Sequence, residues 1–136
     1  MLPKGAHVFV SSGCATPVTF LAALDAKGWS LDEVWITHHH SDHVQGLGTI
    51  LARFPATVRG AAADAHRLPP LDAELRDGET FTFAGHHVRV MDVSGHTIGH
   101  LAYYVEYAKA VFTADSLMAL GCGRLFEGTA GQMWTS

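Results

Sequence analysis

The chain has 136 residues, of which 48% are hydrophobic and 16% are charged. This composition is typical of a folded protein with a buried core, so we expect one domain over residues 1–136 and no extended disorder. The formal net charge is -4 and no run of basic residues occurs, which argues against nucleic acid as a partner.

The cysteines and the N-terminal sequence bear on cellular location. Cys14 and Cys122 lie far apart and form no CxxC spacing, so a secreted disulfide framework is not expected. Residues 1–5 lack the basic segment and apolar run of a signal peptide, and no apolar stretch approaches the ~20 residues of a membrane helix. We therefore expect a cytoplasmic protein with no membrane partner.

The first half of the chain mixes helical and strand patterns. Pro17 begins a segment with an apolar face that Gly28 ends, which predicts a helix. Residues 33–37 are rich in β-branched and aromatic side chains, which predicts a buried strand. Residues 47–54 carry apolar side chains at helical spacing, so a second helix is expected to end before Pro55.

Strand patterns dominate the second half. A short strand is expected at residues 56–59, whereas residues 61–70 show no clear period. Four further strands are expected, at residues 80–83, 88–93, 101–105 and 110–113. The first two of these four are expected to pair as a hairpin. The order predicts an α/β fold whose strands end in loops that carry His or Asp.

Histidine is the compositional outlier, with ten in the chain and four of them within residues 38–43. His38 and His40 are two residues apart, whereas Asp42 and His43 are adjacent, between a predicted strand and a predicted helix. This spacing lets the first pair point one way and the second pair the other, which suits two neighbouring metal ions. The alternative is a solvated histidine-rich loop or an expression tag, which the position inside an α/β pattern disfavours.

Two later segments each carry a single candidate ligand. His96 follows the strand at residues 88–93, in a loop whose glycines permit a tight turn. Asp115 follows the strand at residues 110–113. Taken singly, a histidine at a strand end is more often a structural residue, and such an aspartate is commonly a turn or cap residue. Their order after the histidine cluster makes them candidate metal ligands.

The succession HxHxDH, GHTxGH and a strand-terminal Asp resembles the metallo-β-lactamase superfamily over most of the chain. The resemblance implies the αββα sandwich of that superfamily and two metal sites. It implies that the first metal is bound by His38, His40 and His96, that the second is bound by Asp42 and His43, and that Asp115 bridges both. Zinc is the expected metal, with iron or manganese as alternatives.

Residues 121–129, Gly-Cys-Gly-Arg-Leu-Phe-Glu-Gly-Thr, are similar to a stretch of glyoxalase II, the hydroxyacylglutathione hydrolase family. The structural alternative for this segment is a glycine-rich surface loop. The resemblance implies a small-molecule glutathione thioester as partner, with Arg124 binding a carboxylate of the substrate. Phe126 stands where relatives often carry tyrosine, so one expected hydroxyl contact is absent.

The implied reaction is zinc-dependent hydrolysis of an S-2-hydroxyacylglutathione to a 2-hydroxy acid and glutathione. A metal-bound hydroxide would attack the thioester carbonyl, and no side chain is expected to act as the nucleophile. Two alternatives stay open. One is another enzyme of the superfamily, such as a lactonase or a persulfide dioxygenase, and the other is a catalytically silent metal-binding fragment.

The chain also departs from the family pattern. Residues 10–13 replace a segment whose Asp supports the metal site in the family. We expect an incomplete sandwich that lacks N-terminal strands and a C-terminal part, including a later histidine ligand and a helical domain. Little thioesterase activity is therefore expected of residues 1–136 alone, because the second metal would be held weakly and few substrate contacts are present.

The other histidines match no ligand position. Those expected to be surface or hairpin residues are His7, His39, His66, His86 and His87. His100 belongs to the motif that contains His96, and the resemblance implies a structural role beside the site. Neither cysteine has a neighbouring base in the sequence, so thiol catalysis is not expected.

Overall fold

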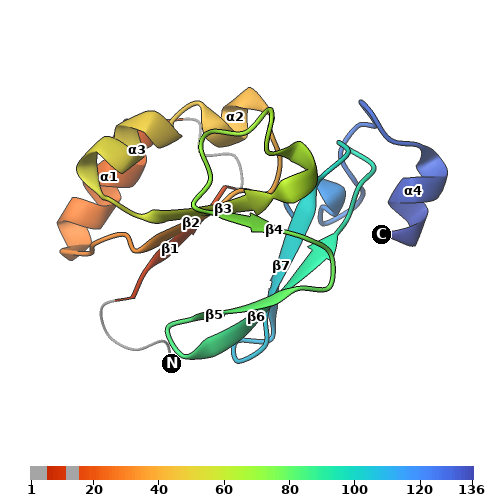
Figure 1. The fold of residues 1–136 in the computed structure, drawn as a ribbon. Helices are drawn as coiled ribbons and strands as arrows, with labels where there is room; N and C mark the ends of the chain where they lie inside the picture. Colours follow the sequence, from red (N-terminus) through yellow and green to blue (C-terminus); the bar gives the residue numbers. More distant parts are fainter. Residues whose placement is uncertain (1–5, 12–15) are drawn as a thin grey trace.

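Two stacked β-sheets form the centre of the structure, a computed structural model that describes residues 6–11 and 16–136 (Figure 1). The first sheet is parallel, in the order β1-β2-β3-β4, and its strands are Val8–Val10, Glu33–Trp35, Thr57–Ala61 and Ala73–Leu75. The second is antiparallel, in the order β5-β6-β7-β8, and its strands are Thr80–Phe83, His86–Asp92, Leu101–Val105 and Ala110–Phe112. The predicted α/β class is confirmed.

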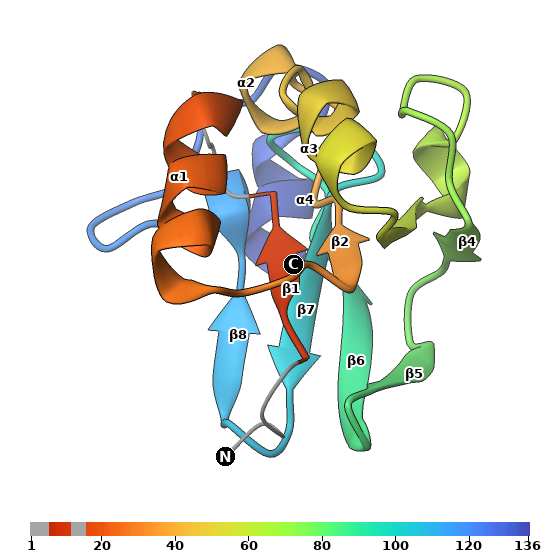
Figure 2. The ribbon, with the colours of Figure 1, turned by 90° about the vertical axis from the view of Figure 1, so that its left-hand side faces the viewer.

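Helices cover the outer face of the first sheet. The helical segments are α1 (Pro17–Lys27), α2 (Ser41–Val44), α3 (Leu47–Arg53), α4 (Ala130–Thr135) and the 3-10 turns η1 (Ala62–Asp64) and η2 (Ala114–Ser116). Figure 1 shows α1 and α3 above the first sheet, on the side away from β5 and β6, and Figure 2 shows α4 behind the first sheet, on the far side of the molecule. The layers run helix, sheet, sheet, which is the incomplete αββα arrangement predicted. No helix among residues 6–11 and 16–136 has the length and apolar character needed to span a bilayer.

Strand β2 is buried on both faces, and its side chains alternate between two cores. The ring of Trp35 points toward the second sheet, where it contacts the rings of Phe83 and Tyr103. Val34 and Ile36 lie in the other core, against the helices. A strand that is covered on both sides favours a continuous apolar run, which is why this segment could be identified from the sequence.

Two contacts from β7 fix the point at which β2 passes into the histidine loop. The Tyr103 hydroxyl donates a hydrogen bond of 2.6 Å to the carbonyl oxygen of Ile36, and the Leu101 amide donates one of 2.8 Å to that of Thr37. Burial raises the pKa of the Tyr103 phenol, so the hydroxyl keeps its proton and remains a donor. The loop that follows therefore starts from a position held by both sheets.

The predicted elements are found with shifted ends. The strand predicted at residues 33–37 ends at Trp35, and the helix predicted at residues 47–54 is α3, which ends at Arg53. A separate short helix, α2, holds Asp42 and His43. Strands β1 and β4 and helix α4 are absent from the sequence prediction, because elements this short show no usable period.

Candidate metal centre

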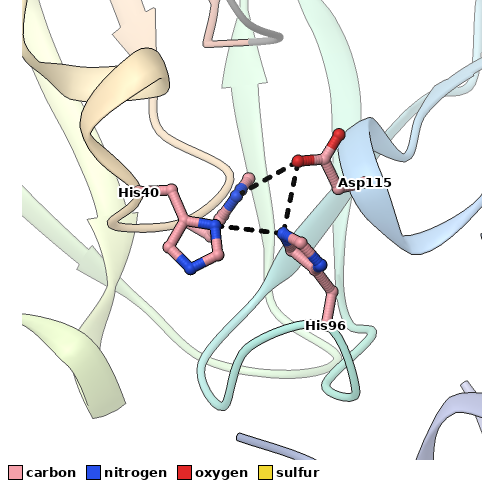
Figure 3. A group of neighbouring side chains, drawn as sticks. His40, His96 and Asp115 are labelled. Atoms are coloured by element: carbon pink, nitrogen blue, oxygen red, sulfur yellow. Dashed lines mark hydrogen bonds and ion pairs between the residues drawn. The ribbon is translucent and has the colours of Figure 1, made fainter. Parts of the chain in front are cut away.

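Three loops at one end of the sheets carry the candidate ligands. The first follows β2 and contains His38 and His40, the second follows β6 and contains His96, and the third is η2, directly after β8, with Asp115. Figure 3 shows His40, His96 and Asp115 turned toward one another from these separate segments. Residues far apart in sequence therefore meet in one cluster.

The cluster has the dimensions of a metal site. One ligand atom from each of His38, His40, His96 and Asp115 lies within 4.8 Å of the others. The Oδ2 atom of Asp115 is 3.5 Å from Nε2 of His38 and 3.3 Å from Nε2 of His96. Nε2 of His96 is in turn 3.0 Å from Nδ1 of His40. Three imidazoles and one carboxylate are a donor set that binds a divalent metal such as zinc.

A second group of donors adjoins the first. Helix α2 places Nε2 of His43 at 3.3 Å from Oδ2 of Asp115, the same oxygen that the first group approaches. Oδ2 of Asp42 is 3.4 Å from Nε2 of His43. The Asp42 side chain is 62% exposed, so a second ion at this place would be accessible to solvent. Asp115 thus stands between the two groups.

Two backbone carbonyls decide which ring nitrogen of two histidines carries the proton. The Nδ1 atom of His96 lies 2.6 Å from the Arg124 oxygen, and the Nδ1 atom of His43 lies 2.6 Å from the Ser11 oxygen. Because a carbonyl oxygen can only accept, both rings donate from Nδ1. The lone pair of each neutral ring is therefore on Nε2, which faces Asp115.

His38 is oriented in a similar way through a hydroxyl. The Thr37 hydroxyl donates to the carbonyl oxygen of Ser11 at 2.8 Å, so its oxygen is free to accept from Nδ1 of His38 at 3.2 Å. Ser11 directly follows β1, in the segment where the resemblance led us to expect an acidic residue. The sequence analysis did not identify Ser11 or Thr37 as supports of the site. Ser11 acts through a carbonyl oxygen, which every residue has, and the Thr37 hydroxyl is oriented by that distant carbonyl.

Burial favours the neutral form of two rings, those of His38 and His100. Desolvation, and then the neighbouring histidines, lower the pKa of His38 to about 2. Burial likewise lowers the pKa of His100 to about 4, and its ring stacks on that of His38 with centroids 4.5 Å apart. Nε2 of His38 is buried and has no hydrogen-bond partner among the described residues. A buried, unprotonated Nε2 atom without a hydrogen-bond partner, beside the Asp115 carboxylate, is suited to bind a cation.

Residues 121–128 close over the cluster. The Gly123 amide donates to the backbone oxygen of Asp115 at 2.7 Å, and the Phe126 amide donates to that of His96 at 3.1 Å. A Cβ atom at Gly123 would stand 2.5 Å from the Asp115 oxygen and 2.7 Å from Nδ1 of His96. Only glycine allows the segment to approach this closely.

The side chain of Arg124 lies at the outer edge of this segment. Its guanidinium is 5.2 Å from the centroid of the Phe126 ring and the residue is exposed. The Phe126 ring meets the rings of His40 and His96 edge-on, with centroids 5.0 Å and 5.3 Å away. Arg124 therefore contributes a carbonyl to the site and presents its charge beside it.

The remaining histidines are mostly where the sequence places them. His66 and His87 are exposed, His86 lies in the β5–β6 hairpin, and His7 is half-buried against Trp29. The prediction that His39 is a surface residue was wrong, because its side chain is only 18% exposed and lies between two carboxylates. Of the two cysteines, Cys122 is exposed and Cys14 falls outside the described residues.

Known proteins resemble the chain in sequence. A profile described as "Metallo-beta-lactamase superfamily" matches residues 4–134. A hydroxyacylglutathione hydrolase of Roseobacter denitrificans is 74% identical over 122 residues, which are 90% of this chain and 47% of that protein. A protein of the same name from Ruegeria pomeroyi is 58% identical over 132 residues, which are 97% of this chain and 51% of that protein. The chain thus spans about half the length of the curated relatives it matches.

A solved structure gives the same result for the fold. The crystal structure described as BLEG-1 B3 metallo-beta-lactamase superimposes with a TM-score of 0.86, covering 96% of this chain and 72% of that chain. The two sequences are 18% identical, so the likeness concerns the fold. Together with the profile match, it confirms the predicted sandwich.

Proposed function

Because the chain belongs to the metallo-beta-lactamase superfamily, we propose that it forms the metal-binding region of a thioester hydrolase of the hydroxyacylglutathione hydrolase kind. The proposed substrate is an S-2-hydroxyacylglutathione, and the products are a 2-hydroxy acid and glutathione. The observation that carries the proposal is the approach of three histidine Nε2 atoms to one oxygen of Asp115, at 3.3 to 3.5 Å. The names of the relatives favour the thioester over other substrates.

Two zinc ions are proposed as the cofactor. The proposed ligands of the first are His38, His40 and His96, those of the second are Asp42 and His43, and Asp115 is shared. The first set is the more buried and the richer in nitrogen, so it is expected to bind more tightly. Iron or manganese would suit the more oxygen-rich second set better than the first.

The metal would supply Lewis acidity to polarise the thioester carbonyl and to acidify a water molecule. The chain itself supplies orientation. His43, His38 and His96 each donate from Nδ1 to a protein oxygen, which keeps Nε2 unprotonated and fixed in direction. The clustered side chains are three histidines and one aspartate, which are proposed to act as ligands and positioning groups.

Arg124 is proposed to bind a carboxylate of the glutathione moiety. Its guanidinium is exposed beside the cluster and is held over the Phe126 ring, which leaves its donors free for a planar anion. The cytoplasmic location and the single domain over residues 1–136 stay predictions.

The metal assignment is tested by counting bound zinc in purified variants. Asp42→Ala should lose one equivalent and keep the other, and His38→Ala combined with His96→Ala should lose both. Asp25→Ala is the control, since Asp25 is a similarly exposed aspartate that pairs with Arg53 far from the cluster. Equal zinc content in the unmodified chain and in all three variants would contradict the assignment of these residues as metal ligands.

The reaction is tested by comparing substrates on the zinc-loaded chain. Hydrolysis of S-lactoylglutathione should exceed that of a γ-lactone, and it should disappear in the His38, His96 double variant. Turnover is expected to stay well below the ~10 s⁻¹ typical of enzymes, because the chain presents few substrate contacts. Faster hydrolysis of the lactone would indicate a lactonase. Oxygen consumption with a glutathione persulfide would indicate a dioxygenase. Zinc binding with no turnover of any substrate would indicate a catalytically silent metal-binding fragment.

A further inference from the structure

A cluster of three charged side chains and one histidine lies beside the proposed metal ligands without joining them. It consists of Arg67, Asp64, Glu127 and His39. Both terminal nitrogens of Arg67 donate to Glu127, with 2.9 Å between Nη2 and Oε2, and Nε of Arg67 donates to Asp64. This fork fixes the direction of both carboxylates. The hydrogen bonds from Arg67 also lower the pKa of Glu127 to about 2, so the carboxylate is ionised.

Glu127 holds the loop that carries His96. Its Oε2 atom accepts a 3.0 Å hydrogen bond from the amide of Ile98, two residues beyond the proposed ligand. The preceding residue, Phe126, donates its amide to the carbonyl of His96 at 3.1 Å. The side chain of Glu127 and the backbone of Phe126 therefore both hold the His96 loop, the first at Ile98 and the second at His96 itself.

The same segment determines the tautomer of His96. The carbonyl that accepts from Nδ1 of His96, at 2.6 Å, belongs to Arg124, three residues before Glu127. If the segment moved away, Nδ1 would lose its acceptor and the proton could move to Nε2, the atom that faces Asp115. A ring protonated at Nε2 cannot bind a metal through that atom.

His39 connects the cluster to the first ligand loop. Its ring lies between two carboxylates, with 3.2 Å from Nδ1 to Oδ2 of Asp64 and 3.4 Å from Nε2 to Oε1 of Glu127. Asp64 is buried, and Gly99, at φ +80, packs so closely against it that a Cβ there would be 2.9 Å from that of Asp64. The residues on either side of His39 are proposed ligands, so its place between the two carboxylates brings the cluster next to the first ligand loop.

We infer that Glu127, together with Arg67, is a positioning residue of the metal site: it holds residues 121–128 against the His96 loop, so that the Arg124 carbonyl keeps Nε2 of His96 available to the metal. The inference rests on the proposed metal site. Loss of the outer partners that orient ligands lowers metal affinity by about 10- to 100-fold. A loss of that size is expected without any change in the ligands themselves.

The test compares two matched glutamate variants. Glu127→Gln removes the negative charge of Glu127. Glu33→Gln does the same in a second bidentate pair, in which Arg59 binds Glu33 with two contacts of 2.9 Å between β2 and β3. Zinc dissociation constants are measured by chelator competition, and melting temperatures are measured on the metal-free proteins. Glu127→Gln should weaken zinc binding about 10- to 100-fold, whereas Glu33→Gln should lower the melting temperature with unchanged zinc affinity.

A second readout needs no metal. In ¹⁵N-labelled, metal-free protein, the side-chain nitrogen shifts of His96 should report the Nδ1-protonated form in the unmodified chain and in Glu33→Gln. In Glu127→Gln they should report a mixture of the two tautomers. Arg67→Lys is the substitute variant if Glu127→Gln does not fold. It keeps the positive charge but loses the two-nitrogen contact with Glu127, so its zinc affinity and its share of the two His96 tautomers should lie between those of the unmodified chain and those expected for Glu127→Gln.

Each outcome decides one of the two proposals. If the unmodified chain binds no zinc, the proposed metal site is wrong, and the inference about zinc affinity is wrong with it. If the unmodified chain binds zinc and Glu127→Gln changes neither the affinity nor the His96 tautomer, the metal site stands and the positioning role is overturned. Equal losses of affinity in the two glutamate variants would also overturn it, because a general loss of stability would then explain both.

Discussion

Replacement of Gly123 by alanine should disrupt the metal site through a single added methyl group. The new Cβ would stand 2.5 Å from the backbone oxygen of Asp115, 2.7 Å from Nδ1 of His96 and 3.0 Å from Cβ of Asp115. Because non-bonded carbon atoms are best separated by about 3.5 Å, relief of this crowding requires a movement of roughly 1 Å. The nearest atoms belong to the backbone and to a ring, so no flexible side chain can turn away.

The required movement is large compared with what a metal site tolerates. Ligand distances need to stay within about 0.2 Å of their preferred values, so a displacement several times larger at Asp115 or His96 misplaces a proposed ligand. It also strains the 2.7 Å hydrogen bond from the Gly123 amide to the Asp115 oxygen. We expect zinc affinity to fall at least tenfold, equivalent to about 1.4 kcal/mol or more.

The same segment provides a matched control. Gly121 lies two residues earlier, and a Cβ there would meet no atom within 4 Å. Gly121→Ala should therefore bind zinc as the unmodified chain does. Both variants are measured by chelator competition, with circular dichroism as a check on folding. Equal zinc affinity in Gly123→Ala and Gly121→Ala would refute the steric reasoning, and equal loss in both would show that the whole segment, rather than this contact, matters.

Three further predictions concern stability, acidity and substrate binding. Tyr103→Phe should lower the free energy of unfolding by about 1–3 kcal/mol, because a buried carbonyl loses its donor, whereas Tyr104→Phe should change it little in urea titrations. Burial lowers the pKa values of His38 and His100 in the folded chain to about 2 and about 4. As the pH falls below ~6.5, these two rings are therefore protonated in the unfolded chain before they are protonated in the folded chain. The metal-free chain should thus have its full stability above pH ~6.5. Its free energy of unfolding should fall toward lower pH by at most about 1.4 kcal/mol per pH unit for each ring. Urea midpoints that are equal at pH 7.5 and 5.5 would contradict this prediction. Arg124→Ala should raise KM for S-lactoylglutathione with little change in kcat or in zinc content, and a fall in kcat alone would argue against a role in binding.

The sequence by itself determined the α/β class, the longer elements and the candidate ligands. Helix α1 could be recognised because Pro17 and Gly28 mark its ends, and Gly28 does adopt the left-handed conformation, at φ 64, that ends a helix. The candidate ligands could be recognised because four of the ten histidines lie within residues 38–43, and because the order of the motifs that contain His38, His96 and Asp115 resembles one superfamily. These signals depend only on residue types and their order along the chain, so they can be read from the sequence.

The tertiary structure alone decided how the site is supported. Ser11 and Arg124 act through carbonyl oxygens, which every residue possesses, so nothing in their residue types predicts that they orient His43 and His96. His39 looked like a surface residue because its two partners, Asp64 and Glu127, are 25 and 88 residues away in the sequence. Contacts of this kind depend on how the loops of two sheets pack at one end of the molecule, and residue spacing along the chain carries no record of that packing.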